Sequence, residues 1–289
     1  MSTFSTPGPL DVVVDGGGGD IRIAASDRGD TVVTITAHAP DRAADVRAAE
    51  QVTVDLSGAT LTIKGPKSWR HSMFGAGNGL ADITIDLPSR SNVSATTALG
   101  TIITNGELGQ VHAKSAMGDI AVDHMAAGRA RTALGNVRID RADGDLDAGT
   151  ASGELHIGDV HGSATVKSSN GNIIVGHVAG DLKAKAANGR IDIERVDRSL
   201  NSKTSNGATR VGQVGEGDVV LTAASGGMEI GIPHGTAAWL DLHSQFGRVR
   251  NELETTAEPG AADTRVKITA KTFNGDVVVR RAAVTPDGR

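Results

Sequence analysis

The stretch from Asn170 to Gly207, NGNIIVGHVAGDLKAKAANGRIDIERVDRSLNSKTSNG, decides the fold. It holds two consecutive copies of an 18-residue unit, each opening on the pair Asn-Gly. Marker glycines recur at this spacing, with one step shorter by a single residue, at Gly100, Gly118, Gly135, Gly153, Gly171, Gly189 and Gly207. Looser copies follow at Gly227, Gly247 and Gly275. A near-constant period with equivalent residues at equivalent positions indicates a repeat architecture.

Apolar and polar residues alternate inside each unit. Leu182, Ala184 and Ala186, for example, alternate with Lys183 and Lys185. A period of two is typical of a half-buried strand whose apolar set faces inward. A second glycine follows most markers after about half a unit, so that each unit reads as strand, turn, strand and turn. Glycine and asparagine readily adopt the conformations that such tight corners require.

These features predict an all-β protein in which residues 96–289 form a β-solenoid with C-terminal capping strands. Each turn of the solenoid, or rung, is a flattened two-sheet coil that spans one 18-residue unit. A three-sided coil of short strands has the same period, but the glycines recur at half of it. An antiparallel sandwich or barrel is the other alternative. The near-constant period favours the solenoid, and its units should then stack in parallel.

Residues 1–95 lack the clean repeat but remain rich in alternating runs, such as TVVTITA from Thr31. We expect them to form a β-rich N-terminal cap, because an uncapped solenoid end is an exposed strand edge that aggregates. Within this region, residues 40–51 (PDRAADVRAAEQ) predict one short helix, opened by Pro40 and Asp41.

Three asparagines precede the marker glycines of consecutive units: Asn170, Asn188 and Asn206. If the units stack, their side-chain amides lie above one another and can form a hydrogen-bonded ladder. We interpret this ladder as structural, because Asn-Gly is a turn pair.

A glycine-rich stretch over residues 64–79, KGPKSWRHSMFGAGNG, is predicted as a loop that carries Trp69, Arg70, Met73 and Phe74. Two interpretations stay open. In the first, the loop folds back and Trp69 plugs an edge of the core, because apolar loop residues usually cover one. In the second, the four side chains form an exposed contact site, because protein interfaces favour Trp, Met, Phe and Arg.

The other bulky cluster comprises Trp239, Leu240, Leu242 and Phe246, and we predict that it caps the last rungs. Residues 252–263, ELETTAEPGAAD, follow as a polar loop. We predict that the chain then returns as strands over Thr264–Ala270 and Asp276–Arg280.

Composition and charge exclude several partner classes. The 289 residues include 29 basic and 34 acidic ones, for a net charge of −5, with no run of Lys or Arg. We expect no nucleic-acid partner, since phosphate binding needs a basic stripe. We also expect no membrane insertion, since no apolar stretch approaches spanning length. The chain has no cysteine, so we expect no disulfide and no thiolate metal site. Residues 1–10 show no signal-peptide pattern, so the expected location is the cytoplasm.

No constellation of residues predicts an enzyme, a cofactor or a metal site. His124 and His177 share an outward column, but three rungs separate them by roughly 14 Å, too far for one metal ion. The strongest acid pair is Asp123 and Asp140 on neighbouring units, beside Arg141, and paired carboxylates can perform acid–base chemistry. We interpret both sets as charges of a solvated face.

The unit G-[DN]-[IV]-x-[VI] occurs as GDIAV from Gly118, GNVRI from Gly135, GNIIV from Gly171 and GDVVV from Gly275. It resembles a bacterial family of β-strand-repeat proteins of unknown function, whose members are often labelled putative adhesins. The DLP motif at residues 86–88 is similar to that family as well. The resemblance spans most of the chain. It implies the solenoid fold and supplies no catalytic residues.

We therefore expect a non-catalytic scaffold or interaction protein, whose partner is an unknown protein or a second copy of the chain. The alternative is a carbohydrate-binding or carbohydrate-active protein that uses one outer face of the solenoid. Catalysis needs a cleft with converging acids, whereas a scaffold needs flat strands and a defined cap. The sequence predicts flat outward columns.

Overall fold

The computed structural model of the chain describes residues 1–65, 79–253 and 264–282. Most of these residues lie in strands, and the described part contains a single helix, so the predicted all-β class is confirmed. The chain divides into two compact units, Met1–Gly144 (unit 1) and Asp145–Arg289 (unit 2). The boundary expected at residue 95 lies inside unit 1.

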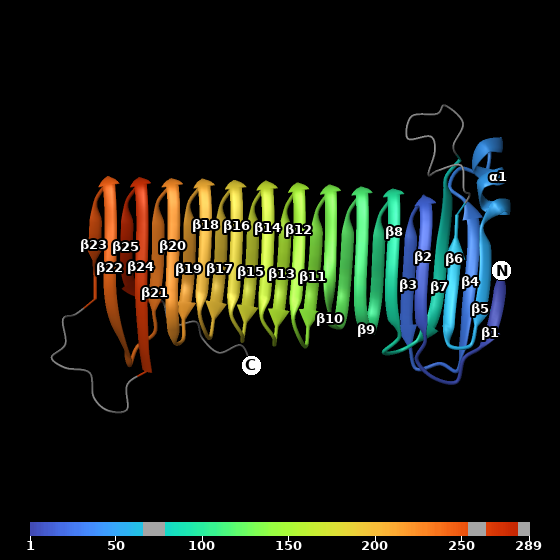
Figure 1. Cartoon of the computed structure of the whole chain (residues 1–289), viewed down its shortest axis with the longest axis horizontal. Coiled ribbons are helices and arrows are strands. Elements are labelled where there is room, and N and C mark those ends of the chain that lie inside the picture. The colour runs from blue at the N-terminus through green and yellow to red at the C-terminus, as the bar shows by residue number, and fades with distance from the viewer. Residues whose placement is uncertain (66–78, 254–263, 283–289) are drawn as a thin grey trace. The chain divides into compact units, whose positions relative to one another are not determined.

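The elements of unit 1 are β1 (Ser2–Ser5), β2 (Asp11–Gly18), β3 (Ile21–Ser26), β4 (Asp30–Ala37), α1 (Ala43–Gln51), β5 (Thr53–Ser57), β6 (Thr60–Lys64), β7 (Ala81–Pro88), β8 (Asn92–Leu99), β9 (Ile102–Met117), β10 (Ile120–Leu134) and β11 (Val137–Ala142). Figure 1 shows them in blue to green. The long strand β9 serves both sheets, because Ile102 pairs with β3 and Val111 pairs with β8.

Parallel pairing joins the rungs of unit 1. On one side the order is β6, β2, β8, β9 and β10. On the other side it is β7, β3, β9, β10 and β11. The rung made of β2 and β3 therefore lies inside the stack, although it comes first in the sequence.

Antiparallel strands cover the outer rung of unit 1. β5 pairs with β6, β4 pairs with β7, and β1 pairs with β4. Helix α1 packs against β4 and β7. The outer edges of unit 1 are therefore the two short strands β1 and β5, with 4 and 5 residues.

Helix α1 begins later than the sequence predicted. Pro40 and Asp41 lie in a turn, where the Arg42 amide donates to the Ala39 carbonyl oxygen at 3.0 Å. Arg42 is the N-cap, with an extended backbone and no capping side chain. Asp45, in the first helical turn, accepts hydrogen bonds from backbone amides outside the helix, so its side chain does not cap α1.

The elements of unit 2 are β12 (Leu146–Ser152), β13 (Leu155–Val160), β14 (Ala164–Asn170), β15 (Ile173–Val178), β16 (Leu182–Asn188), β17 (Ile191–Val196), β18 (Leu200–Asn206), β19 (Thr209–Val214), β20 (Gly217–Ser225), β21 (Met228–Ile232), β22 (Thr236–Phe246), β23 (Val249–Asn251), β24 (Thr264–Asn274) and β25 (Val277–Arg281). Even-numbered strands form one sheet and odd-numbered strands form the other.

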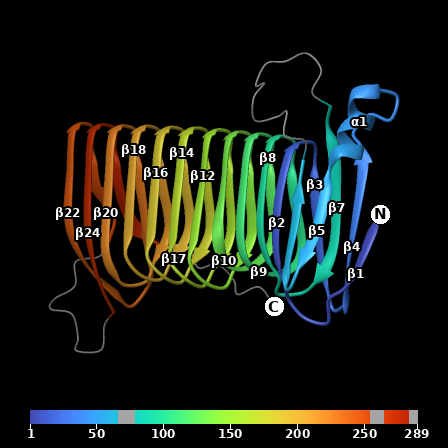
Figure 2. The same cartoon turned by 45° about the vertical axis from the view of Figure 1, so that its right-hand side comes forward.

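The 18-residue repeats of unit 2 stack in parallel, and their strands pair one full repeat away along the chain, as predicted. In one sheet Leu182 pairs with Leu200, and in the other Ile173 pairs with Ile191, so that each partner lies one full repeat further along the chain. The strands of the first sheet lie side by side with their arrows pointing the same way (Figure 2). The predicted parallel solenoid is confirmed.

Alternation sets the core of unit 2 as predicted. Leu182, Ala184 and Ala186 are buried, whereas Lys183 and Lys185 are exposed. The same inward positions recur in each rung, so the core is a column of small and branched apolar residues with no aromatic ring between residues 145 and 235. Close stacking of identical rungs replaces the large side chains that a globular core would use.

The last rungs do not stack in sequence order, which corrects the expectation of consecutive copies. β24 pairs with β20 on one side and with β22 on the other. β25 likewise lies between β21 and β23. The chain therefore makes its outermost rung with β22 and β23 and then returns to insert β24 and β25 (Figure 1).

A second correction concerns the marker glycine of the rung that holds β20 and β21. Gly226, not Gly227, takes the corner, with a φ of 149°. It stacks directly on Gly207, since a Cβ at Gly226 would overlap the Gly207 carbonyl oxygen. The interval from Gly207 to Gly226 is 19 residues, one more than the regular repeat, and the predicted marker is the second glycine of the pair Gly226-Gly227.

Candidate interaction surface

The outermost rung of unit 2 has a neighbour on one side only. β22 pairs with β24 and β23 pairs with β25, and no other described strand pairs in register with either. We call this rung, residues 236–251, the open end. It lies at the left of Figure 1.

The burial of stacked inward residues shows that the open end lacks a covering rung. Val219 of β20 and Ile268 of β24 are fully buried, but Leu240, the next residue of that column, is only half-buried. Leu242 is likewise half-buried beside the buried Ala270. The apolar core of unit 2 therefore reaches the surface at the open end.

Aromatic rings surround this end. Trp239 is 74% exposed, Phe246 59% and Phe273 54%, and the fourth described aromatic residue is Phe4 in unit 1. Phe246 and Phe273 make an edge-to-face contact with ring centroids 5.1 Å apart. The predicted capping role of Trp239 and Phe246 is wrong for both rings, because Trp239 takes an outward position in the alternation and Phe246 ends its strand. Exposed aromatic side chains such as Trp239 and the Phe246–Phe273 pair are typical of contact sites.

Charges of both signs flank the open end. The Asp241 carboxylate lies 3.6 Å from the Lys271 ammonium group, and the Arg248 guanidinium lies 3.6 Å from the carboxylate of Asp276, between β24 and β25. His243 is the cross-strand neighbour of Lys271, two positions along the strand from Asp241. Such exposed pairs add little stability, so these charges are available to orient a partner.

The asparagine ladder lies elsewhere in unit 2. The side-chain amide of Asn188 donates to the Asn170 carbonyl oxygen at 2.9 Å, and that of Asn206 donates to Asn188 at 3.0 Å. All three side chains are exposed at the corner before a marker glycine. They link three successive rungs.

The predicted contact residues Trp69, Arg70, Met73 and Phe74 lie outside the described residues. Both interpretations of their loop stay predictions. The described residues that flank the segment are anchored at both ends. The Gly65 amide donates to the Asp15 carbonyl oxygen at 2.7 Å, and the Leu80 amide donates to a carboxylate of α1 at 3.0 Å.

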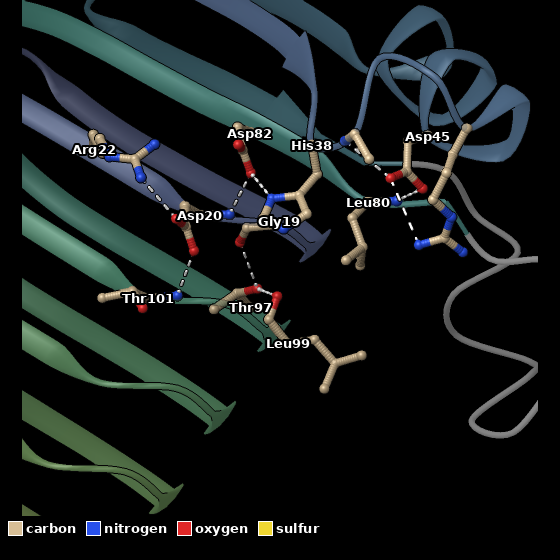
Figure 3. Close-up of polar contacts among 12 residues, drawn as sticks. Gly19, Asp20, Arg22, His38, Asp45, Leu80, Asp82, Thr97, Leu99 and Thr101 are labelled. Carbon is tan, nitrogen blue, oxygen red and sulfur yellow. Dashed lines mark hydrogen bonds and ion pairs between the residues drawn. The ribbon is translucent and has the colours of Figure 1, made fainter.

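Figure 3 shows the second of these anchors. The fully buried Asp45 accepts hydrogen bonds from the backbone amides of Ala39 and Leu80, at 3.1 and 3.0 Å, and so ties α1 to the start of β7. Nearby, Asp82 accepts from the Asp20 amide at 2.9 Å and contacts the His38 ring at 3.0 Å. The hydrogen bond to Asp82 raises the pKa of His38 above its ordinary value. This cluster is structural, since the carboxylates of Asp45 and Asp82 each accept hydrogen bonds from backbone amides.

One corner of unit 2 gathers titratable side chains from three rungs. His177 contacts Asp159 through Nδ1 at 2.8 Å and Asp197 through Nε2 at 2.9 Å. His161 and Arg195 contact the same two carboxylates from their other sides. Partial burial lowers the pKa of His177, but the hydrogen bonds to Asp197 and Asp159 outweigh it, so the pKa is raised. The sequence predicted this column as exposed charges and did not predict the bracketed ring.

The candidate acid pair has other partners. Asp123 accepts a hydrogen bond from the Gly106 amide at 2.9 Å, and Asp140 pairs with Arg138 at 2.8 Å. In the part of the chain that the structure describes, no group of three or more His, Cys, Asp or Glu side chains is placed to hold a metal ion. None of the described helical segments has the length and apolar character needed to cross a membrane.

Sequence reasoning missed the open end because it took the last three copies as consecutive rungs. A signal was present in the spacing. The corner glycines run Gly207, Gly226, Gly247 and Gly275, so that each interval is longer than the one before it and all three exceed the regular repeat. The last interval contains residues 252–263, enough chain to reverse the stacking order.

Comparison with protein families is consistent with this repeat. The family model described as Toastrack DUF4097 matches residues 11–280, across both units. The chain belongs to the Toastrack DUF4097 family. The resemblance to a bacterial β-strand-repeat family is thereby confirmed. No curated protein matches this Toastrack chain.

Solved structures similar to this Toastrack protein include a putative adhesin from Bacteroides fragilis, 13% identical, with 96% of this chain and 95% of that chain covered and a TM-score of 0.46. A putative cell adhesion protein from Clostridium sporogenes is 9% identical, with coverages of 97% and 98% and a TM-score of 0.22. A putative lipid binding protein from Parabacteroides distasonis is 14% identical, with coverages of 96% and 95% and a TM-score of 0.31. At these values no function is transferred.

Proposed function

We propose that this Toastrack protein is a non-catalytic interaction module that binds a protein partner at the open end of unit 2. The observation that carries the proposal is the half-buried state of Leu240 and Leu242, whose counterparts one rung inward are fully buried. A strand edge and a section of apolar core are exposed together there. Natural proteins usually shorten, charge or cover such an edge, and adding a strand to it is a common mode of recognition.

The rim of the open end supports the same proposal. Trp239 and Phe246 are the kind of large exposed side chain that supplies most of the binding energy at protein interfaces. The charged pairs around them, such as Asp241 with Lys271, set orientation more than affinity. A partner that covers the edge therefore gains apolar burial and directional contacts together.

The non-catalytic part of the proposal rests on the acids. Asp123 holds the backbone amide of Gly106 and Asp140 holds the guanidinium of Arg138, as structural charges do. The alternative of a carbohydrate-binding outer face gains no support from residues 145–235, which contain no Phe, Trp or Tyr ring for a sugar to stack on. The predicted contact loop with Trp69 stays a second candidate surface.

The test compares three purified baits in pull-downs from the host, with mass spectrometry of the captured proteins. Leu242→Lys places a charge in the open core section, whereas the matched control Val220→Lys places the same charge on the outward face of β20. We expect proteins captured by the wild type and by Val220→Lys to be lost with Leu242→Lys. Equal capture by all three folded baits would show that binding lies elsewhere.

A further inference from the structure

We infer that the partner at the open end is a second copy of this chain, with β22 of one copy pairing antiparallel to β22 of the other about a two-fold axis. This inference rests on the proposed function and names its partner. It follows from the edge of β22, the outer strands of unit 1, and the charges beside the strand.

Among the described residues, the free edge of β22 lacks most of the features that protect sheet edges. The strand has 11 residues, contains neither Pro nor Gly, and is uncharged at its inward positions Ala238, Leu240, Leu242 and Ser244. Natural edge strands are short, carry an inward charge or Pro, or are bulged. A long regular edge of this kind favours pairing with another strand.

The described outer strands of unit 1 are too short to match β22 in head-to-tail growth. Its outer strands, β1 and β5, have 4 and 5 residues and belong to antiparallel pairs. A two-fold axis instead brings together two copies of β22 that are identical in length and antiparallel by symmetry. The resulting contact is isologous and closed, so the product is a dimer and not a filament.

The segment between β23 and β24 is a poor cover for the open end by composition. Residues 254–263 lie outside the described residues, and their sequence, ETTAEPGAAD, contains no Val, Ile, Leu or aromatic residue. A second β22 is a better match, because it brings its own Leu240 and Leu242 to the exposed core section. Pairing then continues the apolar column across the two-fold axis.

The charges of β22 favour a register centred on Leu242 over one centred on Asp241. Pairing centred on Leu242 places each Asp241 opposite the partner's His243, places Leu240 opposite Ser244, and joins the two Leu242 side chains. Pairing centred on Asp241 would instead oppose two carboxylates, which is destabilising. The geometry therefore favours the register centred on Leu242.

The first experiment measures mass by light scattering across a concentration series of the purified full chain. The expected mass is twice the 29.5 kDa of one chain. Leu242→Lys should raise the dissociation constant about tenfold or more, and Val220→Lys should not change it. Leu240→Lys provides a second edge variant if Leu242→Lys fails to fold in a thermal melt.

The second experiment identifies the interface. The chain has no cysteine, so Val220→Cys takes one spin label per copy. Val220 lies two strands inside the edge, and five strand spacings separate the two labels across the proposed axis. Double electron–electron resonance should therefore give a distance of about 25 Å, since strands are about 4.8 Å apart.

Three outcomes overturn the inference. They are a monomer at every concentration, an open-ended series of larger masses, and a dimer whose label distance is far above the expected value. If the purified chain is monomeric while host proteins still depend on Leu242 for capture, the proposed function stands and only the choice of partner fails. If neither association depends on Leu242, both proposals fail.

Discussion

Corner glycines allow the backbones of neighbouring rungs to stack closely. At Gly226 the φ of 149° and the nearby Gly207 carbonyl oxygen leave no place for a Cβ. At the adjacent Gly227 a Cβ would meet nothing closer than the Asp276 carbonyl oxygen at 3.4 Å. Two neighbouring glycines therefore have different roles.

We predict that Gly226→Ala lowers the free energy of unfolding by about 2–3 kcal/mol, through backbone strain and overlap with the rung below. The matched control Gly227→Ala should change it by less than about 1 kcal/mol. Denaturant melts followed by circular dichroism measure both. A larger loss for Gly227→Ala would return the corner to the position that the sequence predicted.

The asparagine ladder has a central member that makes both of its amide bonds. Asn188 donates to Asn170 and accepts from Asn206. At roughly 0.5 kcal/mol for each exposed bond, Asn188→Ala should cost about 1 kcal/mol and Asn206→Ala about half of that. The triple Ala variant should cost about as much as Asn188→Ala alone, because it removes the same two bonds. Costs that add fully in denaturant melts would mean that the three amides act independently.

His177 should make the stability of unit 2 depend on pH. Partial burial lowers its pKa in the folded protein, but the hydrogen bonds to Asp197 and Asp159 outweigh burial, so the pKa is raised above 6.5. His161 and Arg195 contact the outer sides of the same two carboxylates. A raised folded pKa contributes stability that is fully present below about pH 6.5 and is lost as the pH rises through the folded pKa. Stability should therefore fall from weakly acidic to weakly alkaline pH.

We expect His177→Gln to be less stable than the wild type below pH 6.5 and to lose less stability as the pH rises. The control is His156→Gln, which removes an exposed ring from the outward face of β13. Thermal melts at a series of pH values give the comparison. A wild-type decline that survives intact in His177→Gln would assign the pH dependence to another group.

At the scale of the strand, alternation decides which substitutions the solenoid tolerates. Ala184 is fully buried in β16 between Leu182 and Ala186, while Lys185 points outward. Ala184→Phe should lower the free energy of unfolding by roughly 1–3 kcal/mol, because the close-packed column cannot take a ring. Lys185→Phe, the same ring on the outward face, should leave it nearly unchanged. A larger loss for Lys185→Phe than for Ala184→Phe would mean that the faces of β16 are inverted.

The strands of unit 2 up to β21 could be predicted from the sequence because local pattern and rung geometry agree there. Alternation identified inward residues such as Leu182, and the period of Asn-Gly pairs set the parallel register. These signals are local, so a single sequence is enough to detect them. The helix was also predicted, but its first residues belong to a turn, because Asp45 holds backbone outside α1.

The stacking order at the chain's last rungs could not be predicted from the same signals. β22 and β24 both show strand alternation, and nothing in alternation says which of them lies next to β20. The order depends on which pairing buries more apolar surface, which is a non-local property. The predicted capping role of Trp239 has the same weakness, because the bulk of a side chain does not say which face of its strand it takes.

At the scale of the whole molecule, the sequence order of the rungs departs from their stacking order in both units. In unit 1 the early rung of β2 and β3 lies inside the stack, and the outer rung is covered by α1 and antiparallel strands. In unit 2 the late rung of β24 and β25 lies inside, and the described residues place no strand over β22. The outer rung of unit 1 is therefore covered, whereas that of unit 2 is the surface to which we assign the partner.

Hydrogen exchange measured by mass spectrometry reports directly on the backbone edge of β22, where we place the partner. The assembled protein is compared with the dissociated one, obtained by dilution or with Leu242→Lys. We predict slower exchange over residues 236–251 on assembly, and unchanged exchange over the already protected strands β12 to β19. Protection gained on other strands, with residues 236–251 exchanging alike in both states, would contradict this placement of the partner.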